Sequence, residues 1–119
     1  MMTKYGNRKV KRDGMVFDSV REYNRWRTLK LLEDIGEISN LRRQVKFELI
    51  PKQYSDEERT KAGKPKMIER EVTYIADFVY TDNEYNVEIV EDAKGMKTTD
   101  YILKRKLMLY IHGIRILEV

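Results

Sequence analysis

Asp77, Asp92 and Lys94 are the residues whose types and spacing in this sequence point most directly to chemistry. Asp77 stands in the middle of an otherwise apolar run, residues 74–80, where a lone carboxylate is costly unless it is paired or binds a cation. Asp92 and Lys94 are two residues apart, so on a strand their side chains lie on one face. A short turn at residues 81–84 separates the two segments, so a hairpin can bring Asp77 near Asp92.

Two carboxylates and a lysine at one edge of a sheet form a set with a physical use. Hard divalent cations such as Mg²⁺ prefer oxygen ligands and combine a few carboxylates with waters and substrate phosphate. Such a cation lowers the pKa of a bound water and offsets charge on a phosphate during transfer. The lysine ammonium can hold the phosphate, or orient and help deprotonate the attacking water. The pattern therefore favours a metal site that activates water beside a phosphate.

The same three residues also have structural explanations, which the sequence leaves open. Asp92 and Lys94 can form an ordinary salt bridge on a sheet edge, which is worth little. Asp77 can pair with a structural partner inside the sheet. Glu91 faces away from Asp92 and is expected to be a structural or rim residue.

Glu22 is a fourth candidate with two competing roles. It follows Ser19 by three residues, which is the spacing of a capping box at a helix N-terminus. It also shares a helical face with Trp26 and Leu29, so its carboxylate could equally point into the sheet.

Hydrophobic periodicity and turn residues predict the elements that must position these side chains. We expect helices at about 19–35 and 99–112, and strands at about 41–50, 70–80, 86–94 and 114–119. Residues 51–68 are polar and predict a mobile loop or a long hairpin connection, and Arg12–Met15 predicts a short hairpin turn. The predicted fold is a mixed α/β (α+β) domain of order α-β-β-β-α-β, with a central mixed sheet flanked by helices. The connection through the second helix is long enough to make the third and fourth strands parallel neighbours. On that helix we expect an apolar, core-facing side made of Leu103, Leu107, Tyr110 and Ile111.

Bulk properties bound the class of protein. The 119 residues, 41% hydrophobic and 37% charged, predict a basic N-terminal arm, residues 1–16, and a single domain, residues 17–119. The chain has no cysteine and one histidine, which argues against disulfides, thiolate metal sites, a zinc cage and a Ser-His-Asp hydrolase. We find no secretory signal and no run long enough to span a bilayer, so the expected location is the cytoplasm.

Charge is distributed unevenly along the chain. The formal net charge is +6 for residues 1–46, −6 for residues 47–92 and +4 for residues 93–119. Basic flanks around an acidic centre fit a protein that grips a polyanion and concentrates carboxylates within the grip. Scattered solvated charge would give the same balance.

The combination of Asp77 with Asp92-Ala93-Lys94, and an acidic residue on the first helix, resembles the PD-(D/E)XK nuclease superfamily. The predicted element order is also the core order of that superfamily. More closely, the chain resembles a family of small phage and prophage proteins described as endonuclease-like. The matching stretches are residues 17–22, 36–49, 74–80 and 90–104. The superfamily motif has proline directly before its first aspartate, and this chain has Ala76 there. Many members of the superfamily also lack that proline.

The resemblance implies a role for each matching position. Asp77 and Asp92 become metal ligands for Mg²⁺ or Mn²⁺, and Glu22 a direct or water-mediated metal partner. Lys94 becomes the cation that orients water or phosphate, and Gln44 a supporting residue. Basic side chains then become candidates for DNA backbone contacts: Lys97, Lys104 and Lys106 around the second helix, and Lys4, Arg8, Lys9, Lys11 and Arg12 in the arm.

The resemblance thus implies a metal-dependent DNA endonuclease of a phage, acting in the cytoplasm of a bacterial host. No base-reading module is evident, so selection of a DNA structure such as a branch, flap or junction is expected, in recombination or replication. Resolving a junction needs two symmetric cuts and so implies a homodimer. A non-catalytic DNA-binding protein that retains the nuclease fold is the alternative, and a phage protein that binds a host protein is a third.

Overall fold

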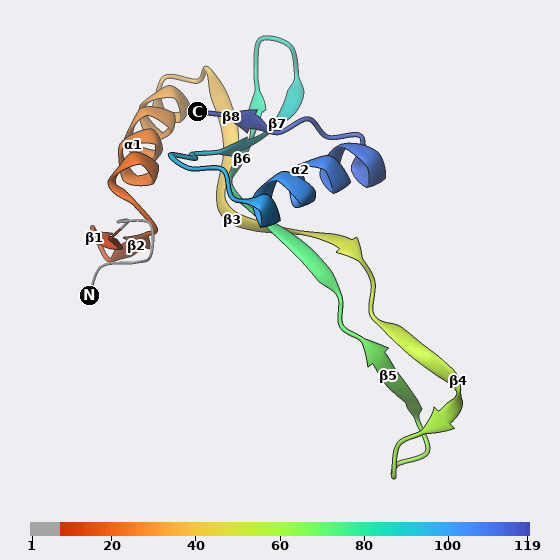
Figure 1. Cartoon of the computed structure of the whole chain (residues 1–119). Helices are drawn as coiled ribbons and strands as arrows, with labels where there is room; N and C mark the ends of the chain where they lie inside the picture. Colours follow the sequence, from red (N-terminus) through yellow and green to blue (C-terminus); the bar gives the residue numbers. More distant parts are fainter. Residues whose placement is uncertain (1–7) are drawn as a thin grey trace.

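The computed structural model describes residues 8–119 as a mixed α+β fold with two helices and a mixed central sheet (Figure 1). Lys4 and the rest of residues 1–7 lie outside the described residues. The central sheet has the strand order β3-β6-β7-β8, and two further pairs of strands, β1-β2 and β4-β5, form hairpins of their own. The strands are β1 (Val10–Arg12), β2 (Met15–Phe17), β3 (Ile38–Ile50), β4 (Gln53–Arg59), β5 (Pro65–Glu69), β6 (Val72–Asp82), β7 (Val87–Asp92) and β8 (Leu117–Glu118). The helices are α1 (Val20–Asp34) and α2 (Thr99–His112).

The central sheet and its two helices follow one another as predicted: α1, β3, β6, β7, α2 and β8. β3 pairs with β6 and β6 with β7, both antiparallel, while β7 and β8 are parallel neighbours. The parallel pair arises because α2 carries the chain back across the sheet, as the length of that connection predicted. The mixed α+β class with a mixed central sheet is therefore confirmed within the described residues, and β1, β2, β4 and β5 are strands in addition to the predicted six elements.

Helix α1 begins and ends at the residues that the capping pattern indicated. The Ser19 hydroxyl accepts a hydrogen bond from the Glu22 N–H at 3.1 Å, which satisfies one free donor of the first turn. Gly36 follows the helix with a φ of +83°, a conformation that favours glycine. Leu29 is fully buried on the inner side of the helix and packs with Phe78 and Tyr80 of β6.

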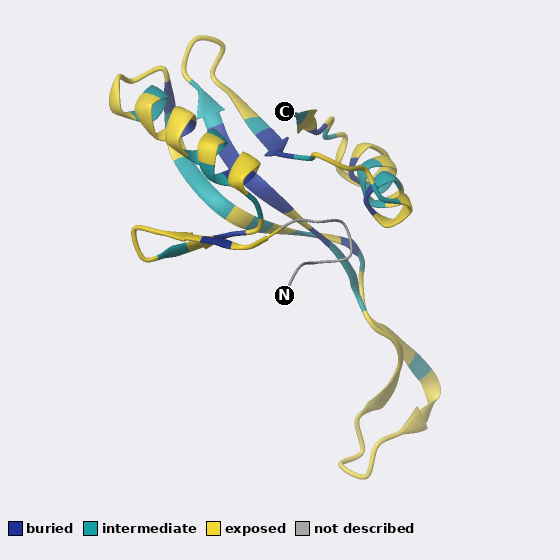
Figure 2. Cartoon of the chain, turned by 60° about the vertical axis from the view of Figure 1, so that its left-hand side comes forward, coloured by how far each residue is buried: buried dark blue, intermediate teal, exposed yellow. Residues whose placement is uncertain are grey.

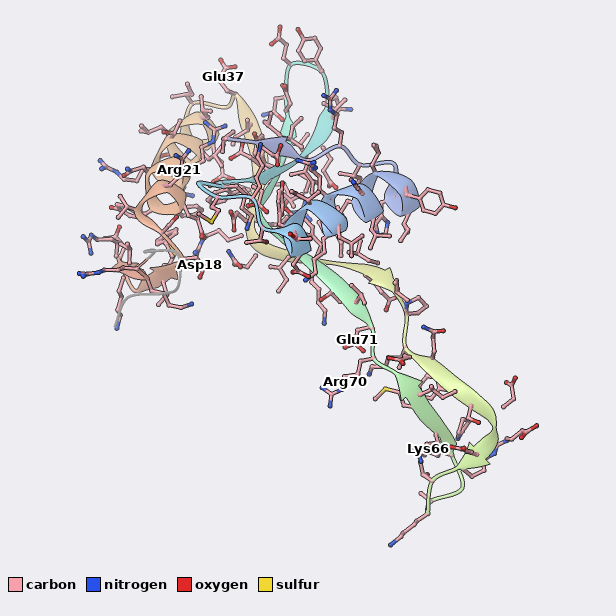
Figure 3. All side chains as sticks on the ribbon, viewed as in Figure 1. Asp18, Arg21, Glu37, Lys66, Arg70 and Glu71 are labelled. Carbon is pink, nitrogen blue, oxygen red and sulfur yellow. The ribbon has the colours of Figure 1, made fainter. Side chains whose placement is uncertain are left out.

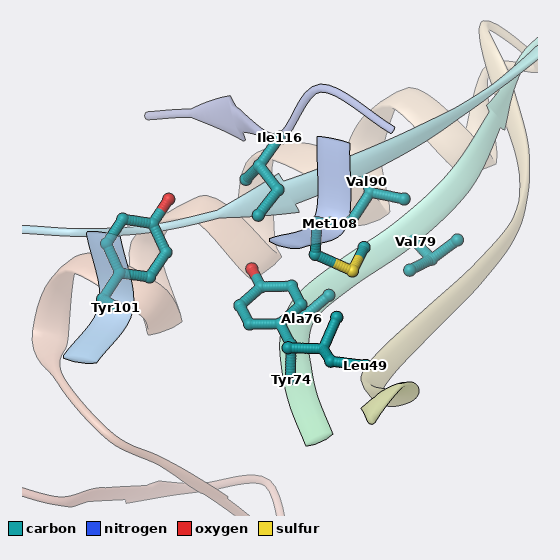
Figure 4. Close-up of a cluster of buried hydrophobic side chains, with 8 residues drawn as sticks. All are labelled: Leu49, Tyr74, Ala76, Val79, Val90, Tyr101, Met108 and Ile116. Atoms are coloured by element: carbon teal, nitrogen blue, oxygen red, sulfur yellow. The ribbon is translucent and has the colours of Figure 1, made fainter. Parts of the chain in front are cut away.

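Helix α2 covers the other side of the sheet, but only partly with the face that was predicted: Leu107 packs against the core cluster as expected. Tyr101 and Met108 are its buried residues, and both belong to the core cluster drawn in Figure 4. Leu103, Tyr110 and Ile111 are 57%, 87% and 42% exposed, so their assignment to the core was wrong. The helix carries apolar residues on nearly every side, and periodicity alone therefore does not select the side that meets the sheet.

The polar segment after β3 is not a loop. β4 and β5 form a two-stranded antiparallel hairpin that extends β3 and β6 away from the rest of the molecule (Figure 1). Nearly all of its residues are exposed, as the burial colours of Figure 2 show. The prediction of a long hairpin connection was therefore right. The sequence showed no apolar alternation there because neither face of this hairpin packs on a core.

The N-terminal turn also forms as predicted. Asp13 and Gly14, with φ of +52° and +78°, join β1 to β2. Val10 and Phe17 are buried, and the Arg43 guanidinium carbon lies 4.0 Å from the Phe17 ring centroid. Within residues 8–119, neither helix is long and apolar enough to cross a membrane.

Candidate metal centre

The pairing of β6 with β7 brings Asp77 and Asp92 together, as the hairpin argument predicted. Phe78 pairs with Glu91, and one further step in the same register places Asp77 opposite Asp92. The two side chains are 8% and 1% exposed. Beyond the last paired residues, Oδ2 of Asp77 accepts a hydrogen bond from the Ala93 N–H at 2.9 Å.

Asp77 is buried because the alternation of side chains changes at this point of the sheet. Tyr74 and Ala76 of β6 pack on the cluster beside α2, whereas Phe78 packs on the cluster beside α1. Strict alternation would put Phe78 on the same side as Ala76. Asp77 lies at this change of phase, between Ala76 of one hydrophobic cluster and Phe78 of the other. Its neighbours in the chain are therefore apolar on both sides.

Gln44 of β3 marks the same change on the neighbouring strand. Arg43 pairs with Phe78 and Val45 with Ala76, so Gln44 lies opposite Asp77. Its φ of +52° is the left-handed region, which is strained for a residue other than glycine and recurs at functional sites. The Gln44 amide nitrogen donates to Oε1 of Glu22 at 3.1 Å and to Oδ1 of Asp77 at 3.4 Å. Gln44 therefore joins two of the predicted site carboxylates.

Glu22 fills both of the roles that the sequence left open. Its Oε2 accepts from the Asp18 N–H at 3.1 Å, a bond of the helix N-terminus, while Oε1 faces Gln44 and the Arg43 guanidinium at 3.4 Å. The carboxylate is 2% exposed and belongs to the same cluster as Asp77. Capping thus aims one oxygen of Glu22 at the site.

Asp92 and Lys94 form the predicted salt bridge, and it is part of the site rather than an exposed pair. The Lys94 ammonium lies 3.5 Å from Oδ1 of Asp92 and 4.9 Å from the centroid of the Tyr101 ring. Oδ2 of Asp92 accepts a hydrogen bond from the Tyr74 hydroxyl. Oδ1 is buried and has no hydrogen-bond partner among the described residues. The Asp92 carboxylate therefore has unused capacity to accept a donor or a cation.

The electrostatics of the site show a deficit of positive charge. Burial, and then the neighbouring Asp92 carboxylate, raise the pKa of Asp77 to about 7, against the opposing effects of the Ala93 N–H and Lys94. Burial and then Asp77 also raise the pKa of Glu22. Asp77 thus repels the Glu22 carboxylate and is itself repelled by that of Asp92 when all are charged, so the site favours a proton or a cation at neutral pH.

The structure adds Asp18, which the sequence analysis did not select. Single carboxylate oxygens of Asp18, Glu22 and Asp77 lie within 4.8 Å of one another, close enough to hold one metal ion. This group contains Asp18 in place of Asp92, whose carboxylate faces Tyr74 and Lys94. Its position directly before the N-cap Ser19, one turn before Glu22, is a signal that could have indicated it.

Asp18, Glu22 and Asp77 line a pocket of about 190 Å³. Since one water molecule takes up roughly 30 Å³ of liquid volume, the pocket has room for a hydrated cation and part of a ligand. Arg21 and Lys94 contribute cationic side chains to its lining, and sequence reasoning also missed Arg21. Asp18 directly precedes the N-cap of α1 and Arg21 is the second residue of that helix; both are labelled in Figure 3. The pocket thus combines carboxylate oxygens with cations able to meet an anion.

The predicted DNA contacts divide into those near the pocket and those away from it. Lys9 lies 3.2 Å from the Asp18 carboxylate, and Lys104 lines a hollow next to Lys94. Lys97 pairs with Glu118 at 3.5 Å. Lys11, Arg12 and Lys106 are exposed and line none of the hollows next to the pocket, and Arg8 is exposed beside β1.

Glu91 is a structural residue and not a rim residue. Its fully buried carboxylate accepts two 2.7 Å hydrogen bonds from the Arg25 guanidinium and one of 2.7 Å from the Tyr80 hydroxyl. This bidentate pair ties α1 to β7 on the side of the sheet away from Asp92. It fixes α1, which carries Glu22 and directly follows Asp18 and Ser19, relative to the strand that carries Asp92.

Comparison with known proteins identifies the family. The chain belongs to DUF1064, described as a protein of unknown function, and the family profile matches residues 2–115. No curated protein and no solved structure matched the chain.

Proposed function

We propose that this protein is a metal-dependent nuclease that hydrolyses phosphodiester bonds of DNA. The observation that carries the proposal is the set of buried carboxylates of Glu22, Asp77 and Asp92 beside the Lys94 ammonium. Burial of three acids around few cations is costly for stability, so a functional ligand is the better explanation. The same arrangement underlies the resemblance to the PD-(D/E)XK superfamily, and we assign the fold to its restriction-endonuclease-like core.

The donor set fits a hard divalent cation such as Mg²⁺ or Mn²⁺. It consists of carboxylate oxygens, and the chain has no cysteine to offer a thiolate. Asp77 and Glu22 would hold the cation, with Asp18 as a third ligand. Asp92 adjoins Asp77, and its Oδ1 has no hydrogen bond and lies 3.5 Å from the Lys94 ammonium. When bound, the cation supplies a water of lowered pKa and offsets negative charge on the phosphate.

The protein's own groups orient the reactants. Lys94 lines the pocket, and its ammonium is positioned by Asp92 and the Tyr101 ring, so it would hold the phosphate or the attacking water. Arg21 offers a second cation at the pocket for the phosphate oxygens. Gln44 keeps Glu22 and Asp77 at a fixed separation.

The substrate is proposed to be branched or duplex DNA in phage recombination or replication. Among residues 8–119, neither helix belongs to a recognised base-reading module, which favours recognition of DNA shape over sequence. A homodimer would allow paired cuts at a junction, and DNA as substrate fits a cytoplasmic location in a bacterial host.

The test is cleavage of linear, flapped and four-way DNA in Mg²⁺ or Mn²⁺ by the parent protein and by Asp92→Asn and Lys94→Ala. Matched controls are Asp34→Asn and Lys30→Ala, on the exposed side of α1. We expect the parent and controls to cut at least one substrate, and both site variants to lose about 100-fold or more in rate. Cleavage that persists in both site variants would sink the assignment. DNA binding without cleavage by the parent would favour the non-catalytic alternative.

A further inference from the structure

The β4–β5 hairpin, residues 53–69, has no structural reason to exist in its present form. Both of its faces are exposed, and it contributes no residue to either hydrophobic cluster. A two-stranded hairpin without a core is marginally stable in water. A long projecting hairpin is therefore expected to have a partner.

The charges of the hairpin are separated along its length. Its outer end, residues 59–66, carries four cations and no acid: Arg59, Lys61, Lys64 and Lys66. The acidic residues lie behind this end, at 56–58 and 69. Of the four cations, only Lys66 forms an ion pair within residues 8–119, a solvent-exposed one with Glu58 at 3.7 Å. The end of the hairpin, called here the basic tip, is thus free to meet a polyanion.

The turn at the basic tip is well defined. The Thr60 N–H donates to the Lys64 carbonyl at 2.8 Å, and the Gly63 N–H donates to the Thr60 carbonyl at 2.9 Å. Gly63 has a φ of +80°, which allows the close reversal of the chain. Lys61 and Lys64 therefore flank one tight turn, and the strands present them together.

We propose that the basic tip binds the backbone of duplex DNA about one helical turn away from the cleavage site. This inference rests on the proposed function, because it takes DNA as the substrate of the carboxylate pocket. A two-stranded ribbon fits a major groove about 12 Å wide. Lysine side chains at the tip of such a ribbon reach phosphates, which gives affinity without choice of sequence.

The separation of the tip from the pocket supports this geometry. Lys64 precedes Asp77 by 13 residues along β5 and β6, which at roughly 3.3 Å per residue gives at most about 43 Å. One turn of duplex DNA spans about 34 Å, so the tip and the pocket can meet the same side of one duplex. Lys46 and Lys52 line a hollow at the base of the hairpin, on the way from the pocket to the tip. Lys66 and Arg70 mark the projecting part of the hairpin in Figure 3.

A protein partner is the less favoured occupant. The exposed large apolar side chains of the hairpin are Tyr54 and Met67, which pair across it, and Ile68, and three such side chains cover far less area than the apolar patches typical of protein interfaces. The cationic end points instead to a polyanion.

The test measures DNA affinity by fluorescence anisotropy in Ca²⁺, which does not require cleavage. The ligand is a four-way junction with arms of about 20 bp, compared with arms of about 7 bp, shorter than one turn. The tip variant is Lys61→Ala with Lys64→Ala. The control, Arg27→Ala with Arg115→Ala, removes the same charge from exposed positions outside the hairpin.

On long arms we expect the tip variant to bind about tenfold more weakly than the parent, with a slope of log affinity against log salt smaller by about two. The control keeps the parent's salt slope. On short arms the parent and the tip variant bind equally, because the duplex ends before it reaches the tip. Equal affinity of tip variant and parent on long arms, or an equal loss in the control, would overturn the proposal.

A second variant replaces residues 53–70 by Asn-Gly, a two-residue hairpin turn. Lys52 and Glu71 form an ion pair of 3.9 Å across the base, so the strands are close enough there to be joined. We expect an unchanged circular dichroism spectrum of the remaining fold and the same loss of affinity on long arms. Unchanged DNA affinity together with a change from dimer to monomer would assign the hairpin to a second copy of the chain instead. The affinity measurement does not depend on cleavage, so the two proposals can fail separately. If the protein cleaves no DNA but the tip variant still binds more weakly, only the proposed catalysis is refuted.

Discussion

The backbone N–H of Ala93 donates a 2.9 Å hydrogen bond to Oδ2 of Asp77. Ala93 lies between Asp92, the last residue of β7, and Lys94, so this bond joins Asp77 of β6 to the segment that directly follows β7. The bond favours the charged form of Asp77, yet burial and Asp92 still raise the pKa of Asp77 to about 7. The site therefore keeps its geometry at the expense of electrostatic stability in the absence of a cation.

Removing the charge of Asp77 is expected to stabilise the metal-free protein. In Asp77→Asn at pH 8 and in EDTA, the repulsion among the buried carboxylates is reduced, and the free energy of unfolding should rise by on the order of 2 kcal/mol. Thermal unfolding followed by circular dichroism measures the gain. In Mg²⁺ the order should reverse, because the parent gains stability from the cation and the variant does not. An Asp77→Asn variant less stable than the parent in EDTA would contradict the electrostatic argument. The control, Asp34→Asn, removes an exposed carboxylate and should leave the stability unchanged.

The same shift predicts how metal-free stability depends on pH. Between about pH 4 and pH 7 the folded protein keeps a proton on Asp77 that the unfolded chain has released, because the folded pKa is the higher of the two. The stability contributed by this proton is fully present below about pH 4 and is lost as the pH rises through about 7. Glu22 acts in the same direction. The measurement is the unfolding free energy of Asp77→Asn minus that of the parent, in EDTA from pH 4 to 8. This difference should increase with pH, and a flat profile would show that Asp77 titrates normally.

Gln44 allows the backbone strain to be separated from the role of its side chain. Gln44→Ala removes the amide and keeps the strained φ of +52°, whereas Gln44→Gly removes the amide and relieves the strain. The glycine variant should therefore be more stable than the alanine variant by about 1 kcal/mol. Both should lose cleavage to a similar degree, since both free Glu22 and Asp77 from their shared donor. If the glycine variant recovers the parent's cleavage rate, the amide has no positioning role.

The sequence was sufficient for the elements with strong local signals. Helices α1 and α2 matched their predicted limits closely because Ser19 and Thr98 cap them and Gly36 and Gly113 end them. The β6–β7 hairpin followed from a short turn between two β-rich segments. These signals act over a few residues, and local sequence carries them in full.

Features that depend on contacts between distant parts of the chain could not be predicted in the same way. The role of Asp18 depends on where the start of α1 sits against β6, a contact between residues 59 apart in sequence. The change of side-chain phase at Asp77 depends on the two helices, which pack on opposite sides of one sheet. The buried face of α2 was misassigned because its apolar residues surround the helix, so only the packed sheet selects among them.

Tyr74 provides a test of whether Asp92 is held for catalysis or only for structure. Its hydroxyl donates to Oδ2 of Asp92, and Tyr74→Phe leaves Lys94 as the remaining partner of that buried carboxylate. We expect a loss of about 1–3 kcal/mol in unfolding free energy, as for other buried acceptors that lose a donor. We also expect cleavage to fall by about tenfold, because groups that orient a metal-site ligand typically contribute that much.

The matched control for Tyr74→Phe is Tyr80→Phe. The Tyr80 hydroxyl also donates to a buried carboxylate, that of Glu91, on the opposite side of the same sheet. Glu91 keeps both hydrogen bonds from Arg25 and lies outside the pocket, so this variant should lose stability without a change in cleavage rate or in the Mg²⁺ concentration needed for half-maximal rate. If both variants lose cleavage in proportion to their loss of stability, Tyr74 acts only on the fold. A loss of cleavage rate in Tyr74→Phe but not in Tyr80→Phe, measured well below the unfolding temperature of both proteins, would show that the Tyr74 hydrogen bond orients Asp92 for the reaction.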